Sequence, residues 1–495
     1  MTIAIYRDIF LKLQVLFLAL SALSMYLLDM AGSENFVLLY SIWNIVTYTL
    51  LFYGEMRYAP DFHPFQILAL AAIMFIGVNG ISLYSDMRSG EELFFGIYIV
   101  NDCIAQGMLF LSLEHIILFG TFYFLEHKYG NSSSMIAERI KDANVDYFRW
   151  AIYSYIIVWT LRGVNQLYPL DTVSSVLVEI TTTGPMLTLL LLLFAKLENP
   201  YRNGIMFLHW VIVLLEIILV LNHGMKEEII RLLVPYCLYV LIEYKSGGKV
   251  KIKFSSAITI GILSIFVIAF VFPYISLFRE ISNRTNREWN QVSVSETFDA
   301  YEDYVAREGK YENDKENRSI GYVVDRAGSI VSNAWSVDNA QKEGTKPDYF
   351  MYCLMAPIPR IIWPDKPVIL TGSMAHQLTI GAADWMDESN AKEDKTSISL
   401  GFIGSCVLSL GVYGGILLAS LMSVWIWYVW HVSRKKLHNN VIAMWMFLAY
   451  VSLILKDFEG LQDCGINMFF INAVYIIIMN IISYRNKYKL STVDR

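Results

Sequence analysis

A run of prolines and cations near residue 360 has the residue types best suited to chemistry in this chain. It reads Ala356-Pro-Ile-Pro-Arg-Ile-Ile-Trp-Pro-Asp-Lys-Pro367 and contains four prolines. Proline fixes φ and lacks a backbone N–H, so the segment cannot form an ordinary helix. At membrane depth such backbone is tolerated only where protein encloses it or where it lines a wet cavity. A cavity with Arg360 and Lys366 at the membrane surface suits an anion, and lipid-linked phosphates are natural candidates.

A histidine follows this segment and is the candidate general base. His376 lies in Thr371-Gly-Ser-Met-Ala-His-Gln, and an imidazole can accept a proton or orient a hydroxyl near neutral pH. The alternative, that a lone loop histidine is structural or solvent-exposed, stays open. Asp365 and the acids at 384–388 are equally available carboxylates with no distinguishing spacing.

Ionisable residues inside apolar segments form a second group of candidates. Arg162, Glu179, Glu216 and Arg231 lie in or at the ends of such segments, where a charge costs about 2.5–3.5 kcal/mol on insertion scales. Arg162, Lys226 and Arg231 are expected on the same side of the membrane as the proline segment. Guanidinium groups bind phosphate oxygens bidentately, which suits a diphosphate. The alternative is that these cations pair with Glu179 or nearby acids and only neutralise buried charge.

The elements that must position these residues are membrane helices. The chain has 495 residues, 55% of them hydrophobic and only 17% charged, with a mean hydropathy of +0.44. This composition predicts an all-α, polytopic transmembrane helical bundle. About twelve spans are expected, near 9–28, 36–53, 65–84, 104–125, 150–168, 173–195, 204–222, 229–244, 254–278, 410–431, 441–456 and 467–484. Segments 93–125 and 398–431 are each long enough for a helix plus an interfacial or re-entrant piece.

The lysines and arginines of the short loops predict the orientation. With the N-terminus inside, twenty of them fall on the cytoplasmic side and five on the other, as the positive-inside rule requires. Both termini are therefore expected in the cytoplasm. Three regions follow: an N-terminal membrane region at 1–278, a large extracytoplasmic loop at 279–398, and a C-terminal membrane region at 399–495.

The large loop is predicted to contain short helices that cover the outer face. Residues 295–318 place Phe298, Tyr301 and Val305 at helical spacing, residues 320–340 carry an apolar stripe, and 349–356 form a short apolar helix. The alternative is an inert solvated loop. With twenty acidic and fourteen basic residues, the loop accounts for the whole net charge of −6. The charge therefore gives no indication of a nucleic-acid partner. The five scattered cysteines argue against a structural metal site or a disulfide framework.

The proline segment resembles the signature of a known family. Pro359-Arg360-x-x-Trp363-Pro364-x-Lys366-Pro367 is similar to the loop motif of bacterial oligosaccharide repeat-unit polymerases, the Wzy-type O-antigen and exopolysaccharide polymerases. Gly224-Met-Lys-Glu-Glu-Ile-Ile-Arg231 looks like their glycine and basic residue at a helix start. Thr396–Gly401 through Gly411-Val-Tyr-Gly-Gly415 looks like their glycine-rich return into the membrane. The resemblance covers roughly residues 220–420.

The resemblance implies a GT-C-like glycosyltransferase of the bacterial inner membrane. Its substrates would be undecaprenyl-diphosphate-linked oligosaccharides in membrane lipid, with a chain-length regulator protein as a further partner and with no metal or other cofactor. Arg360 and Arg231 would stabilise the departing diphosphate, and His376 would be the candidate base. Further diphosphate-binding residues would be Lys226, Lys366, Arg162 and Arg279. Lys226 stands where arginine is common, and His376 lacks the His–Gly spacing of the related O-antigen ligases. The catalytic base therefore stays open.

Two alternatives remain, one of them an enzyme and the other a transporter. An O-antigen ligase would join finished glycan to a lipid A core, and a flippase or transporter would move the lipid-linked sugar without chemistry. A flippase should carry cations deep in a central cavity on several helices. Here the cations are expected at the outer face, beside a large loop, and this favours the enzyme.

Overall fold

The computed structural model describes the helical parts of the chain. These are residues 3–28, 34–59, 63–89, 101–129, 146–167, 175–198, 203–223, 294–306, 330–355, 401–436 and 441–455, with isolated positions at 232–239, 281, 358–364 and 472–480. Every regular element among them is helical, which confirms the predicted all-α class. The helices are α1 Ile3–Leu28, α2 Glu34–Tyr58, α3 Pro64–Ala72, η1 Ile73–Val78, α4 Asn79–Ser89, α5 Asn101–Tyr129, α7 Tyr147–Leu167, α8 Ser175–Glu198, α9 Asn203–His223, α13 Val294–Ala306, α15 Ile330–Lys342, α16 Pro347–Met355, α19 Phe402–Lys436 and α20 Val441–Leu455.

Five of the described helical segments are long and apolar enough to cross a membrane. They are Ile3–Leu27, Glu34–Tyr58, Pro64–Ser85, Cys103–Tyr129 and Phe402–Lys436. Shorter apolar helices occupy Ile180–Lys196, Gly204–Leu219 and Val441–Val451. The chain is thus compatible with a membrane protein. The predicted spans at 229–244, 254–278 and 467–484 lie mainly outside the described residues, so the total of twelve and the GT-C-like arrangement stay predictions.

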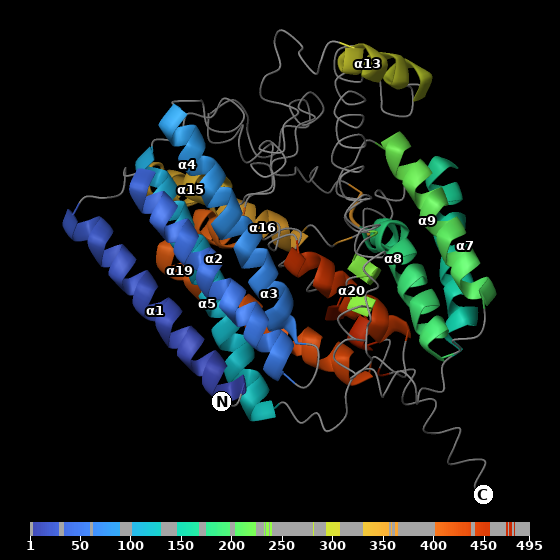
Figure 1. The fold of residues 1–495 in the computed structure, drawn as a ribbon, viewed down its shortest axis with the longest axis horizontal. Coiled ribbons are helices and arrows are strands. Elements are labelled where there is room, and N and C mark those ends of the chain that lie inside the picture. The colour runs from blue at the N-terminus through green and yellow to red at the C-terminus, as the bar shows by residue number, and fades with distance from the viewer. Residues whose placement is uncertain are drawn as a thin grey trace, which may run out of the picture. The chain divides into compact units, whose positions relative to one another are not determined.

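The chain divides into two compact units. Unit 1 comprises Met1–Met135, Gly163–Glu179 and Asp325–Arg495, and unit 2 comprises Ile136–Arg162 and Ile180–Val324. In unit 1, α15 packs on both α5 and α19, which also pack on each other, while α2 packs on α3, η1 and α4 (Figure 1). A helix of the predicted loop is therefore part of the core of unit 1. The three-region organisation predicted from hydropathy stays a prediction.

The predicted helices of the loop have different surroundings. The expected stripe at 320–340 includes α15, where Ile330, Ala334 and Val337 are fully buried. The expected helix at 349–356 is α16. In α13, by contrast, Phe298 is 53% exposed, and whether α13 covers the outer face stays a prediction. Beyond Ala306, the predicted helix at 295–318 lies outside the described residues.

Candidate functional site

Most of the site residues predicted from the sequence lie outside the described residues. This holds for Arg360, His376, Arg231, Lys226, Lys366 and Arg279. Their predicted convergence at one face therefore stays a prediction. Around the proline segment the structure describes Ile358, whose N–H donates to the carbonyl of Met355 at the end of α16 (3.0 Å), and residues 362–364, of which Ile362 is 73% exposed.

Arg162 is the predicted site residue that the structure describes, and it lies in an ion pair. Its two terminal nitrogens donate to the two carboxylate oxygens of Glu216 on α9, at 2.8 and 2.9 Å. Tyr155, two turns earlier on α7, donates its hydroxyl to the same carboxylate (3.2 Å). The guanidinium also donates to the carbonyl of Thr181 (3.3 Å) and lies 5.9 Å from the ring centroid of Trp159.

This arrangement matches the charge-neutralising alternative for Arg162. The Glu216 side chain is only 2% exposed and that of Arg162 21%, so each compensates a charge that burial would otherwise penalise. The partner that the structure describes is Glu216 of α9. A diphosphate-binding role for Arg162 would require the guanidinium to share or exchange this partner.

In unit 1, α19 is two helices joined at a sharp break. Gly411 has φ +74° and ψ 176°, a conformation that L residues with a side chain rarely adopt. The break separates a short helix, Phe402–Leu410, from the long helix that continues to Lys436. A Cβ placed on Gly415 would lie 2.7 Å from the backbone of Val407. Residues eight apart in a continuous helix are about 12 Å apart, so the short helix folds back on the start of the long one.

The short helix is buried, and helix α15 covers one side of it. All positions from Phe402 to Ser409 are buried, and Ile403 and Val407 pack with Val337 of α15 in one apolar cluster. Glycines allow close approach on both sides of α15. A Cβ on Gly107 of α5 would lie 2.6 Å from Ala334, and a Cβ on Gly404 would lie 2.5 Å from Asn333 Oδ1. Small residues at helix contacts are the usual means of close packing in membranes.

Two buried side chains bind the first turn of the short helix. The N–H of Ile403 donates to Glu114 Oε2 of α5 (3.0 Å), and the N–H of Gly404 donates to Asn333 Oδ1 of α15 (2.7 Å). The first N–H groups of a helix have no intrahelical acceptor, and the helix dipole favours a negative group there. At the other end, the N–H of Lys346 donates to the carbonyl of Leu408 (2.7 Å). The short helix is thus bound at both ends by other elements.

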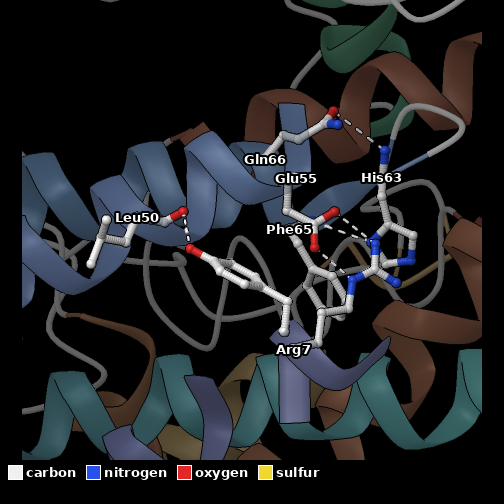
Figure 2. A network of polar contacts seen from close by, with 7 residues as sticks. Arg7, Leu50, Glu55, His63, Phe65 and Gln66 are labelled. Atoms are coloured by element: carbon white, nitrogen blue, oxygen red, sulfur yellow. Dashed lines mark hydrogen bonds and ion pairs between the residues drawn. The ribbon is translucent and has the colours of Figure 1, made fainter. Parts of the chain in front are cut away.

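A third polar cluster lies where α1, α2 and α3 meet (Figure 2). Arg7 donates to both carboxylate oxygens of Glu55 at 2.6 and 2.7 Å, and its guanidinium lies 4.5 Å from the ring centroid of Phe65. His63 caps α3, accepting the N–H of Phe65 through Nδ1 (3.4 Å). Burial, with the positive charges of Arg7 and Arg434, lowers the pKa of the His63 imidazole well below its usual value of 6.5.

Residues 69–424 match the protein family described as "Domain of unknown function (DUF8712)". The match covers more than half of the chain. The chain belongs to the DUF8712 family. No curated protein and no solved structure matches the chain.

The DUF8712 region contains two of the three polar clusters. It includes the pair of Arg162 and Glu216, the caps Glu114 and Asn333, and every site residue predicted from the sequence. The cluster of Arg7, Glu55 and His63 precedes it. The caps and the helix break therefore lie within the segment that matches the family.

The sequence interpretation missed Glu114, although a signal for it exists. An acid within the predicted span 104–125 is costly in lipid and normally faces protein, and Glu114 is 1% exposed. Its hydrogen-bond partner, 289 residues away in sequence, could not be predicted. Among the described residues, no group of three or more His, Cys, Asp or Glu side chains could hold a metal ion.

Proposed function

We propose that this DUF8712 protein is a membrane glycosyltransferase that polymerises undecaprenyl-diphosphate-linked oligosaccharide repeat units into O-antigen or exopolysaccharide. The observation that carries the proposal is the segment Pro359–Pro367, which resembles the loop motif of repeat-unit polymerases. The segment begins four residues after α16 ends, and α16 packs on α19. A short connection of this kind suits a segment that must act close to the membrane helices.

The proposed reaction is a glycosyl transfer between two lipid-linked substrates. A hydroxyl of the incoming repeat unit attacks the anomeric carbon of the growing glycan, and the bond from that carbon to the diphosphate oxygen breaks. Undecaprenyl diphosphate leaves, and the hydroxyl proton passes to a base, for which His376 is the candidate. Arg360, Lys366 and Arg231 stabilise the negative charge that develops on the leaving group. Preorganised donors of this kind commonly contribute 10²–10³ in rate each.

The helices of the loop support the proposal in a second way. If residues 279–398 lie outside the cytoplasm, then α15 reaches from the extracytoplasmic side into the core of unit 1. Non-helical backbone at membrane depth must be enclosed by protein or face a wet cavity. If α19 spans the membrane, the break at Gly411, beside α15, is backbone of this kind. A site beside this break would suit the reaction of a diphosphate away from bulk water.

The proposed location is the cytoplasmic membrane of a bacterium, with both termini in the cytoplasm. Arg7, Glu55 and His63 lie near those ends of their helices that the distribution of lysine and arginine assigns to the cytoplasm. Arg434 and Glu126 form an ion pair at the corresponding ends of α19 and α5 (3.7 Å). Both pairs fit a polar end of unit 1 at the membrane surface.

A lipid-linked-sugar transporter is the second candidate, and one observation favours it. Discontinuous helices whose ends meet polar groups within the membrane are common at the binding sites of secondary transporters. The short helix Phe402–Leu410 with Glu114 at its N-terminus has this form. An O-antigen ligase is a further enzyme alternative, and no described contact favours it over the polymerase.

The substitution Arg360→Ala tests the proposal. We expect loss of long-chain polysaccharide, while single lipid-linked repeat units still cross the membrane and reach a ligase. Gels of surface glycan should then show one repeat unit on core in place of a ladder. Arg360→Lys should recover only part of the ladder, because an ammonium keeps the charge but not the planar fork. Arg88→Ala is a matched control, since Arg88 is exposed on the expected outer side and, among the described residues, donates to Tyr84.

Protein levels must be equal in all variants. If Arg360→Ala leaves no repeat unit outside the membrane, the transporter is the correct reading. If it leaves the ladder intact at normal protein level, Arg360 does not stabilise the leaving diphosphate.

A further inference from the structure

Glu114 is a buried acid for which the proposed reaction has no direct use. It lies in the middle of α5, is 1% exposed, and accepts the N–H of Ile403 from a helix 289 residues away. Asn333 accepts the next N–H, that of Gly404, and is also fully buried. Two side chains from two different helices thus bind consecutive N–H groups of one helix end.

These two caps connect the loop to the membrane helices. Asn333 belongs to α15, and the Lys346 N–H that binds Leu408 belongs to the turn between α15 and α16. Helix α16 begins at Pro347, and the proline segment follows it. The caps therefore hold the short helix Phe402–Leu410 against α5 and α15, and α16 is the element that precedes the proline segment in the chain.

We propose that Glu114 and Asn333 are positioning residues for the diphosphate-binding segment. Their side-chain oxygens accept hydrogen bonds from the short helix. These bonds hold the short helix, α15 and α16 together against α5. The effect on catalysis rests on the proposed function. The hydrogen bonds themselves do not depend on the proposed function. The position of the helices and the activity of the chain can therefore be tested separately.

The chemistry of the caps predicts which substitutions keep the position. Glutamine at 114 and aspartate at 333 retain an oxygen that can accept the same N–H, whereas leucine at either position removes the acceptor and leaves a buried N–H unsatisfied. A misplacement of about 1 Å at a reacting group can lower the rate about 10²-fold. We therefore expect Glu114→Leu and Asn333→Leu to lower polymer formation by this order, and Glu114→Gln and Asn333→Asp to keep most of it.

The readout of position is the accessibility of α15. In a chain whose five native cysteines are replaced by alanine, Val337→Cys places one thiol on the fully buried face of α15. A membrane-impermeant maleimide added to intact cells should label this thiol slowly. Labelling should become at least tenfold faster with Glu114→Leu or Asn333→Leu, and should stay slow with Glu114→Gln or Asn333→Asp. Ser336→Ala is the matched control, because among the described residues the Ser336 hydroxyl donates within α15, to the carbonyl of Ser332.

The outcomes separate the inference from the proposed function. Unchanged labelling in both leucine variants overturns the inference, whatever the activity of the chain. Faster labelling with an intact glycan ladder also overturns it, because position would then not matter. Faster labelling with loss of the ladder, reversed in the glutamine and aspartate variants, supports it. If the unmodified chain restores no ladder in a polymerase-deficient host while the leucine variants still label faster, the caps are supported and the proposed function fails.

Discussion

At the scale of single residues, the pairing of Arg162 with Glu216 separates a structural role from a binding role. Each carboxylate oxygen of Glu216 accepts one guanidinium nitrogen, and Tyr155 adds a third donor. Removing one partner of a buried pair leaves the other charge uncompensated, whereas removing both can be nearly neutral. Stability and activity can therefore respond differently to single and double substitutions.

We expect Arg162→Ala to lower the free energy of unfolding by about 3 kcal/mol, the lower end for a buried pair because Arg162 is partly exposed. Arg162→Ala combined with Glu216→Ala should recover most of this loss. Thermal unfolding in detergent measures both. If Arg162 also binds diphosphate, the stable double variant will still lack long-chain glycan. A double variant as unstable as the single one would contradict the pairing.

The lowered pKa of His63 predicts that the protein becomes less stable at acid pH. Burial, with Arg7 and Arg434 nearby, lowers its pKa in the folded chain, whereas the unfolded chain takes up a proton near pH 6.5. The unfolded state then binds more protons below about pH 6.5, so stability falls as the pH falls through this window and is constant above it. Below this pH the free energy of unfolding decreases by up to about 1.4 kcal/mol per pH unit.

His63→Asn should flatten this dependence, because asparagine is a good N-cap and does not titrate. The measurement is the midpoint of thermal unfolding between pH 5 and pH 7.5 in both proteins. An equally steep decline in the asparagine variant would show that another group is responsible.

At the scale of elements, the break in α19 is the feature that the hydropathy pattern indicated most closely. The apolar segment 398–431 was predicted to be long enough for a helix plus a re-entrant piece, and the break at Gly411 confirms a two-part element. The other ambiguous segment, 93–125, contains the start of α5, which is one continuous helix from Asn101 to Tyr129. Both predicted segments are apolar and similar in length, so length does not distinguish them. What distinguishes them is the glycine at the turn and the close approach that Gly415 allows.

One substitution made at two glycines tests the reversal of α19. Gly415→Ala would place a methyl group 2.7 Å from the backbone of Val407 and should destabilise the protein by about 1–3 kcal/mol, as overpacking usually does. Gly163→Ala in α7 is the control, because no described atom lies within 4 Å of the added Cβ. There alanine should be neutral or stabilise by up to about 1 kcal/mol. Equal effects at both positions would argue against the folded-back geometry.

At the scale of the whole molecule, the predicted topology can be tested without knowledge of the substrate. Reporter fusions at residue 495 and after Lys436 should be active only with a cytoplasmic reporter, and fusions within 307–329 only with an extracytoplasmic one. The reason is the excess of lysine and arginine on one side of the predicted spans. A cytoplasmic signal from 307–329 would place α15 on the wrong side for the proposed reaction.

The family match also concerns the whole molecule, because it covers only part of the chain. Residues 69–424 include the buried loop helix α15 and the break in α19, but exclude α1, α2 and α20. The excluded helices nevertheless complete the packing of unit 1, because α2 packs on α3 and α4, and α20 packs on α19. A fragment limited to the family region would therefore expose apolar faces that these helices cover.

The sequence by itself determined the helical class and the approximate position of most described helices, because hydropathy and helical periodicity are local properties. It also identified Arg162 and Glu216 as charges that need compensation. Only the tertiary structure decided that they compensate each other, that α15 lies in the core of unit 1, and that Glu114 binds Ile403. These contacts join residues from 54 to 289 positions apart. They depend on which surfaces fit together, and a local pattern carries no information about a partner so distant in the chain.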